Sequence, residues 1–353
     1  MKHRRVGQQM KWTVLAPGES RTLFDGQALH GVRVAFYEVR PASLPKRALR
    51  KLGLLENERM IADAWKLFEC EDCLREVDAI WLSNAYVPPS HLAWLLEQLP
   101  ELKWVYSQKA GTDHLDLDSF RRRGVKVSNN GPLSSRRVAE MALANIVAQA
   151  KQLPEHVALQ RRRRWRSLPS HDLSRQTVGI VGTGNIGNEL ARLCRALGMR
   201  VIGATRDPQN SSADATAYAR LFRLEGELDT LLAESDYVVL ALPLTPETRG
   251  LISAARLTHM KPDATLVNVA RGPLVDEGAL CRALRRGALG AAYIDCPTHT
   301  PLPPWSQLYR APKLVLTHYS SVNSPRAQED AFEQFTSGLE QLRETGEPPN
   351  RVV

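Results

Sequence analysis

The stretch VGIVGTGNIG at residues 178–187 constrains the fold more than any other part of the chain. Four mostly apolar residues lead into Gly182, Gly184 and Gly187 at G-x-G-x-x-G spacing, and residues 188–198 then follow a helical apolar pattern. In such a strand–turn–helix unit the glycines permit a tight turn, a close approach of a pyrophosphate, and packing of the helix on the strand. Helix N-terminal N–H groups then bind the phosphates. The motif predicts a dinucleotide site formed by these residues: Gly182, Gly184, Asn185 and Ile186.

Strand-like and helical patterns alternate on both sides of this motif. Before it, strand-like runs at 32–36, 79–83, 103–106 and 125–127 alternate with helical candidates at 90–98 and 115–123. After it, MRVIGAT, SDYVVLALP, ATLVNVA, GAAYID and LVLTHYSS predict further strands, with helices at 253–258 and 276–286. This alternation is typical of parallel α/β sheets. We predict an α/β protein with two Rossmann-like, doubly wound parallel-sheet domains.

Two segments are expected to connect these domains. Residues 129–133, NNGPL, are turn-forming and are interpreted as a hinge, with Ser134 or Ser135 capping the next helix. That helix is apolar nearly all round, which predicts burial between domains or at a dimer contact. The amphipathic segment 326–344 is expected to pack back on the first domain. We therefore predict a discontinuous substrate domain, with the dinucleotide-binding domain inserted into it; the predicted boundaries are 1–132 with 318–353, and 133–317.

Charge and composition narrow the function classes. The 353 residues include 47 Lys and Arg against 38 Asp and Glu, a net charge of +9, which favours anionic ligands. The basic run at 161–166 is interpreted as a solvated helix end, because the other basic residues are scattered, so no nucleic-acid partner is expected. Cys70 and Cys73 have no second pair to complete a zinc site, so no metal is expected. Dispersed cysteines, no apolar run of membrane length and no signal-peptide core predict a cytoplasmic protein without a membrane anchor.

The end of the first strand after the glycine motif, which is the second strand of the dinucleotide-binding domain, indicates which nicotinamide cofactor is bound. An acidic residue there holds a ribose 2′-hydroxyl, whereas an arginine accepts a 2′-phosphate. The sequence reads Ala204-Thr205-Arg206 before Asp207. Thr205 can donate a hydrogen bond to a phosphate, and Arg206 can bind it with two N–H groups. Asp207 weakens this prediction without reversing it, so NADP(H) is favoured over NAD(H).

The order of motifs resembles the D-isomer-specific 2-hydroxyacid dehydrogenase family. The matching stretches are AGTDHLDLD (110–118), VSNNGPLSSRRVAE (127–140), VGIVGTGNIG (178–187), DYVVLALPLTPETRGLI (236–252) and VNVARGPLVDEGAL (267–280). The resemblance implies a nicotinamide cofactor in a cleft, a small anionic substrate, and a homodimer through the helix near 134–150. It also implies cofactor contacts from Pro243, Ala270 and Asp295. Backbone amides of Gly111 and Thr112 are expected to hold the substrate carboxylate.

The family transfers a hydride between nicotinamide C4 and C2 of a 2-keto or 2-hydroxy acid, using an arginine, a histidine and a glutamate. Reduction builds negative charge on the carbonyl oxygen, so a cation must stabilise it and an acid must protonate it. Arg271 stands where the family places the arginine. The family's LDVFExEPLP is IDCPTHTPLP here (294–303), so Thr300 replaces the glutamate.

The histidine position also departs from the family pattern. The family's LTPHI corresponds to LTHYS here (316–320), so Tyr319 replaces the histidine in the ungapped register, whereas a one-residue slip would restore His318. The ungapped register is favoured because the flanking prolines align without a gap. On a strand these two side chains would point to opposite faces, so only one would reach the reacting atoms. His299 is a further candidate, although a surface histidine fits its loop equally well.

Two function classes follow from this sequence. The first is an NADP(H)-dependent oxidoreductase acting on a 2-keto or 2-hydroxy acid or a related carbonyl, with a rebuilt acid/base site. The alternative is a redox-inactive, dinucleotide-binding interaction or regulatory protein of the same fold. The presence of Arg271 favours the first class, and the loss of the usual glutamate and histidine is what keeps the second open.

Overall fold

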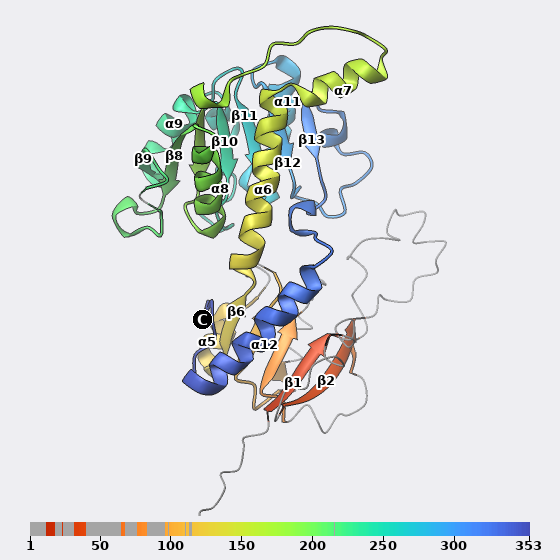
Figure 1. Ribbon diagram of the computed structural model, residues 1–353, viewed down its shortest axis with the longest axis vertical. Helices are drawn as coiled ribbons and strands as arrows, with labels where there is room; N and C mark the ends of the chain where they lie inside the picture. The colour runs from red at the N-terminus through yellow and green to blue at the C-terminus, as the bar shows by residue number, and fades with distance from the viewer. Residues whose placement is uncertain are drawn as a thin grey trace, which may run out of the picture. The chain divides into compact units, whose positions relative to one another are not determined.

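The chain is described from a computed structural model, which covers residues 12–17, 23, 32–39, 65–67, 76–82, 96–97, 99–109, 111–112, 115–214 and 216–353. It forms two compact units: the first comprises residues up to Pro132 with Ser324–Val353, and the second comprises Leu133–Asn323. Each unit contains a largely parallel sheet with helices packed on it, which confirms the predicted fold class (Figure 1). The Cys70–Cys73 pair and most of the predicted helix 90–98 lie outside the described residues.

The second unit is built on a seven-stranded parallel sheet in the order β13-β12-β11-β10-β7-β8-β9. Its strands are β7 (Thr177–Val181), β8 (Arg200–Thr205), β9 (Arg220–Arg223), β10 (Tyr237–Leu240), β11 (Thr265–Asn268), β12 (Ala291–Ile294) and β13 (Leu314–Leu316). The strand order reverses between β7 and β10. The glycine motif follows β7, so it lies at the switch point where open α/β sheets bind ligands.

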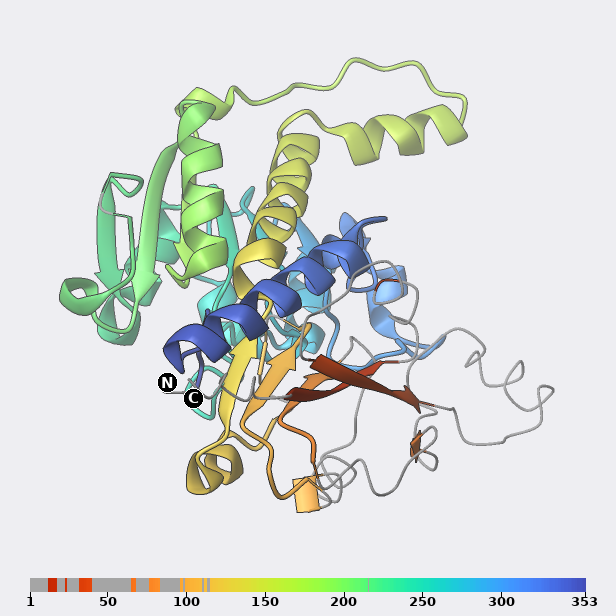
Figure 2. The same cartoon turned by 60° about the horizontal axis from the view of Figure 1, so that its bottom comes forward.

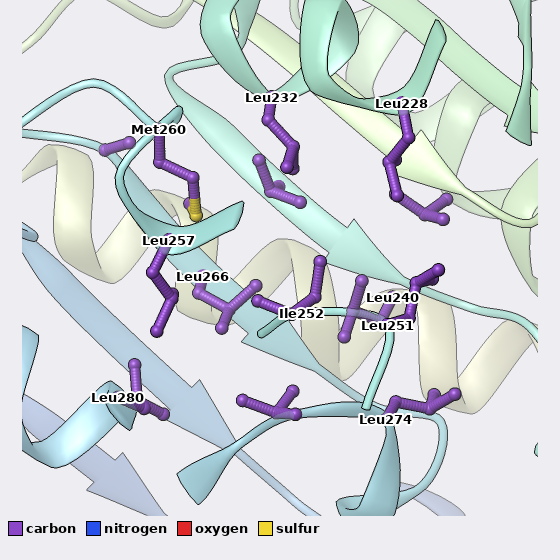
Figure 3. Packing of buried hydrophobic residues seen from close by; sticks show 14 of the residues in the cluster. Leu228, Leu232, Leu240, Leu251, Ile252, Leu257, Met260, Leu266, Leu274 and Leu280 are labelled. Atoms are coloured by element: carbon purple, nitrogen blue, oxygen red, sulfur yellow. The ribbon is translucent and has the colours of Figure 1, made fainter. Parts of the chain in front are cut away.

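Helices cover both faces of this sheet. One face carries α6 (Gly131–Ala150) and α8 (Asn185–Ala196), and the other carries α9 (Leu224–Glu234), α10 (Ala254–Leu257) and α11 (Glu277–Arg286). Figure 3 shows the core of the second face, where Leu228 and Leu232 of α9 and Leu280 of α11 point toward the strands. The remaining helices of the unit are α7 (Leu153–Arg161), η2 (Leu173–Arg175), η3 (Pro208–Asn210), η4 (Gly272–Leu274), η5 (Gln307–Arg310) and η6 (Ser320–Val322).

The first unit has a six-stranded sheet in the order β3-β2-β1-β4-β5-β6, in which only β3 runs antiparallel to its neighbour. The strands are β1 (Trp12–Pro17), β2 (Val32–Val39), β3 (Trp65–Leu67), β4 (Ala79–Leu82), β5 (Trp104–Ser107) and β6 (Lys126–Asn129). Helix α5 (Leu117–Arg123) buries Phe120 against one face. None of the helices in the described part of the chain combines the length and hydropathy of a membrane-spanning segment.

The C-terminal helix α12 (Ala327–Thr345) packs on the other face of this sheet, as its amphipathic pattern predicted (Figures 1 and 2). The ring of Phe335 stacks on Trp104 with centroids 5.2 Å apart and on Trp81 with centroids 5.5 Å apart. Stacked aromatic pairs of this kind contribute about 0.5–1.5 kcal/mol each beyond their buried area. The last helix therefore completes the core formed by the N-terminal strands.

Two predicted element boundaries are wrong. Helix α6 begins at Gly131, so residues 131–133 form its first turn and not a hinge, and Ser134 and Ser135 are buried inside the helix instead of capping it. A proline is compatible with a first helical turn, where its missing N–H has no helical acceptor. Strand β13 ends at Leu316, so the predicted strand up to residue 321 is too long. Residues 318–323 remain with the second unit, because the turn after β13 is hydrogen-bonded to Asp295.

Candidate active site

Packing explains two of the three glycines after β7. Gly182 has φ +103°, and a Cβ there would lie 2.4 Å from the carbonyl oxygen of Ala241 at the end of β10. A Cβ on Gly187 would lie 2.1 Å from the carbonyl oxygen of Gly182, so the first turn of α8 rests directly on the loop. A Cβ on Gly184 would meet nothing within 4 Å. Packing within the protein therefore does not require a glycine at 184, and the open space beside its backbone fits a pyrophosphate.

The N-terminus of α8 is available to an anion. Gly184 is the N-cap, and no side chain among the described residues caps this helix. The first-turn N–H groups and the positive end of the helix dipole therefore remain available to phosphate oxygens. Asn185 is exposed and Ile186 is half-buried on this turn. The open helix N-terminus and the space beside Gly184 are compatible with the dinucleotide site expected from the sequence.

The end of β8 places Thr205 half-buried and Arg206 exposed. The next residue, Asp207, turns into η3, where its carboxylate accepts hydrogen bonds from Asn210 Nδ2 at 2.9 Å and Gln209 N at 3.2 Å. These bonds, the one from Asn210 foremost, lower the pKa of Asp207. Asp207 is thus hydrogen-bonded within its own turn. A carboxylate engaged in this way is a weaker candidate for binding the ribose 2′-hydroxyl, so Asp207 counts less against NADP(H) than it did in the sequence.

A second arginine lies at the same strand ends. Arg223, the last residue of β9, pairs in register with Thr205 of β8. Its Nη2 lies 3.6 Å from Oδ1 of Asp207. Arg223 was not among the predicted cofactor contacts, because the four-residue strand β9 was not recognised. Its sequence RLFR has two adjacent apolar residues between two arginines, so it carries no alternating signal; Phe222 is buried and Arg223 exposed.

Arg271 follows β11 and is held by its neighbours. The side chain of Asn268 donates to the carbonyl of Arg271 at 2.8 Å and accepts from the N–H of Ala270 at 3.0 Å, which fixes the backbone on both sides. The Arg271 guanidinium is half-buried and donates to the carbonyl of Ala270 at 2.7 Å. A Cβ on Gly272 would lie 2.3 Å from the backbone nitrogen of Thr298, so this turn is pressed against the loop after β12.

The loop after β12 carries Thr300, which the sequence comparison places at the family's glutamate position, and His299. Thr300 is half-buried and His299 is exposed. Thr298 donates its N–H to Oε1 of Glu277 at 2.7 Å, which ties the loop to the start of α11. Burial raises the pKa of the Cys296 thiol, so this cysteine is a packing residue and not a thiolate nucleophile.

The turn after β13 carries His318 and Tyr319. Both side chains are exposed, and Tyr319 adopts the left-handed conformation with φ 52°. Because the two residues lie on a turn and not on a strand, the prediction that they point to opposite faces does not apply. Asp295, at the end of β12, is buried and its backbone carbonyl accepts the N–H of Tyr319 at 2.8 Å.

Most predicted site residues of the second unit lie at the carboxyl ends of neighbouring parallel strands. Pro243 is exposed in the loop after β10, where its carbonyl accepts the Thr248 hydroxyl at 2.9 Å. The glycine loop follows β7, Arg206 follows β8, Arg271 follows β11, and Asp295 follows β12. Gly111 and Thr112 belong to the first unit, where they are half-buried in the segment after β5.

Comparisons with known proteins identify relatives of this chain. A family model described as D-isomer specific 2-hydroxyacid dehydrogenase, NAD binding domain, matches residues 143–321. The chain is 31% identical to a glyoxylate reductase of Thermococcus litoralis over 290 residues, which cover 79% of this chain and 84% of that protein. It is 32% identical to a glycerate dehydrogenase of Methylorubrum extorquens over 267 residues, which cover 73% of this chain and 81% of that protein.

A solved structure shows the same architecture. The D-isomer specific 2-hydroxyacid dehydrogenase of Xanthobacter autotrophicus Py2, in complex with NADPH and MES, is 26% identical and superimposes with a TM-score of 0.75. The match covers 98% of both chains. Fold, glycine loop and sequence similarity agree, and the chain therefore belongs to the D-isomer specific 2-hydroxyacid dehydrogenase family.

Proposed function

We propose that this protein is an NADP(H)-dependent reductase of 2-keto acids, working reversibly on the corresponding 2-hydroxy acids. One observation carries the proposal, the placement of Arg271. This residue is half-buried directly after β11, and the side chain of Asn268 holds its backbone. The open glycine loop follows another strand of the same sheet. The bound nicotinamide supplies or accepts the hydride. Arg271 binds the substrate carboxylate and stabilises negative charge on the carbonyl oxygen.

The proposed cofactor preference rests on charge at the ends of β8 and β9. Arg206 is exposed and Asp207 is engaged in capping η3, so a ribose 2′-phosphate meets a guanidinium and no competing free carboxylate. Arg223 supplies a second cation beside Thr205. We expect the 2′-phosphate to accept hydrogen bonds from Thr205 and Arg206, with Arg223 adding electrostatic attraction.

The substrate class is taken from the relatives and from the charge of the site. Relatives that act on glyoxylate and glycerate handle small hydroxy and keto acids. Arginine binds a carboxylate with two parallel N–H···O bonds, so a 2-keto acid suits Arg271 better than a neutral ketone. Gly111 and Thr112 of the first unit are proposed to bind a substrate carboxylate through their backbone amides.

The proton donor is proposed to be Tyr319, with His318 as the alternative. Both lie on the turn after β13, and β13 pairs with β12, the strand that precedes Asp295. Thr300 occupies the position of the family's glutamate, and its neutral hydroxyl cannot raise the pKa of a neighbouring histidine. This favours a proton donor that needs no acidic partner. A tyrosine hydroxyl is neutral at ordinary pH and donates its proton directly.

We further propose a homodimer through α6 and α7. Helix α7 exposes Leu153 and Val157, and the loop that follows it exposes Trp165 completely. An exposed apolar surface of this kind, next to the basic run at 161–166, is typical of an interface and not of a solvated surface. Sedimentation of the full chain is expected to give the mass of two copies, and a monomer at micromolar concentration would contradict it.

A steady-state assay tests the proposed function. Oxidation of NADPH is followed by its absorbance while a panel of 2-keto acids, glyoxylate included, is added. We expect turnover with at least one acid, loss of turnover in Arg271→Ala, and partial activity in Arg271→Lys, which keeps the charge but loses the planar fork. If NADPH binds but no acid is reduced, the proposal fails and the redox-inactive alternative is favoured.

A further inference from the structure

The carboxylate of Asp295 is saturated by donors from its own surroundings. Its side chain is 2% exposed. Oδ1 accepts from Thr317 Oγ1 at 2.5 Å, from the Ser320 N–H at 2.9 Å and from Tyr293 Oη at 3.4 Å. Oδ2 accepts from the Ser321 hydroxyl and from the Ser321 N–H at 3.4 Å. All these donors except Tyr293 belong to the turn after β13.

This saturation limits what else Asp295 can bind. A carboxylate offers about four lone-pair positions, and the contacts above occupy them. A buried carboxylate is stable only when hydrogen bonds offset its lost hydration, and bonds to a charged acceptor are stronger than bonds between neutral groups. A cofactor amide that took one of these positions would have to displace a protein donor. Asp295 therefore has little capacity left for the cofactor contact expected from the sequence.

The same contacts define the shape of the turn. Tyr319 has φ 52°, a left-handed conformation that is strained for a non-glycine residue. Two hydrogen bonds hold the backbone at this residue. The Tyr319 N–H donates to the Asp295 carbonyl, and the Ser320 N–H donates to the Asp295 carboxylate. The His318 N–H donates to Ser320 Oγ at 3.4 Å, so the other acid/base candidate is held by the same turn.

We propose that Asp295 is a positioning residue, which fixes the turn 317–321 and thereby the acid/base side chain, and that it does not bind the cofactor. Its catalytic consequence rests on the proposed function, whereas its structural role does not. The two roles of Asp295 predict opposite results: a turn anchor affects backbone order and turnover, and a cofactor ligand affects affinity for NADPH.

Ser321→Ala and Thr317→Val each remove one hydroxyl donor and leave the carboxylate in place, so they are milder than Asp295→Asn. Thr258→Val is the matched control, because its exposed hydroxyl donates to the carbonyl of Ala255 in the same unit, away from this turn. We expect the two turn variants to speed hydrogen exchange of amides 317–321 by about tenfold or more. We expect kcat to fall, with KM for the acid and NADPH affinity unchanged, and Thr258→Val to change none of these.

Two results overturn the proposal. One is a loss of NADPH affinity in the turn variants without faster exchange at 317–321, which would make Asp295 a cofactor ligand. The other is faster exchange with an unchanged kcat, which would make its role merely structural. If the wild-type protein reduces no acid, the proposed function fails, and exchange together with NADPH affinity still decides between turn anchor and cofactor ligand.

Discussion

Single side chains at the carboxyl ends of β8 and β9 set the proposed cofactor preference. Arg206→Ala and Arg223→Ala should each lower NADPH affinity by about tenfold to a hundredfold, because each removes a cation that faces the 2′-phosphate. NADH affinity should change little. Arg220→Ala is the control on the same strand, since Arg220 lies over the Phe222 ring at 4.1 Å. Fluorescence titrations that give the wild type equal affinities for both cofactors would contradict this prediction.

The proton donor is tested by two neighbouring residues on one turn. Tyr319→Phe removes only a hydroxyl and should lower kcat by about 10²–10⁴, the usual contribution of a positioned acid. His318→Ala should change kcat little, and cofactor affinity should persist in both variants. The reverse pattern would mean that the histidine has kept its role through a one-residue shift in alignment. If neither variant loses turnover while Arg271→Ala does, no side-chain acid acts at this turn.

The positions of candidate site residues along the chain could be predicted from the sequence, whereas their hydrogen bonds could not. The sequence placed the glycine loop, Arg206 and Arg271 just after predicted strands, and the structure has a strand before each of them. The hydrogen bonds of Asp207 and Asp295 could not be predicted in this way. They depend on the turn geometry of η3 and of residues 317–321, and the donors that the turn after β13 supplies to Asp295 stand more than 20 positions along the chain.

In the loop between β7 and α8, packing requires the glycine at 187, and the proposed ligand requires the glycine at 184. Gly187→Ala should lower the unfolding temperature, because its Cβ would lie 2.1 Å from the Gly182 carbonyl oxygen. Gly184→Ala should fold normally and lose NADPH affinity, since its Cβ enters only the open space of the proposed pyrophosphate site. Thermal unfolding and cofactor titration of both variants check this. Equal loss of stability in the two variants would contradict the assignment.

Long periodic elements were predicted well, and short or boundary elements were not. The predicted helices at 276–286 and 326–344 correspond to α11 and α12 within one residue at each end, because caps and charge patterns mark their ends. Strands β1 and β9 were missed, since a short apolar run such as WTVLAP and a four-residue run such as RLFR carry little periodic signal. Helix α6 begins earlier than expected because residues 131–133 form its first turn. In the sequence, residues such as Pro132 have the same pattern whether they begin a helix or form a loop.

At the scale of the whole molecule, the chain leaves the first unit at Pro132 and returns at Ser324. We propose that residues 133–323 form an independent dinucleotide-binding domain, because their apolar cores are formed within these residues alone. A fragment of residues 133–323 should fold and bind NADPH with affinity close to that of the full chain. Circular dichroism and titration check this. A folded fragment without NADPH affinity would place essential cofactor contacts in the first unit.

We propose that this chain reduces a 2-keto acid with Thr300 and Tyr319 at the positions of the family's glutamate and histidine. The most direct test is to incubate the full chain with NADPH and a 2-keto acid whose product is chiral, and to determine the handedness of the hydroxy acid by chiral chromatography. The account predicts the D-2-hydroxy acid, formed by the wild type and absent with Arg271→Ala. An L-product would contradict the assigned geometry, and the absence of any product across the acid panel would contradict the claim itself.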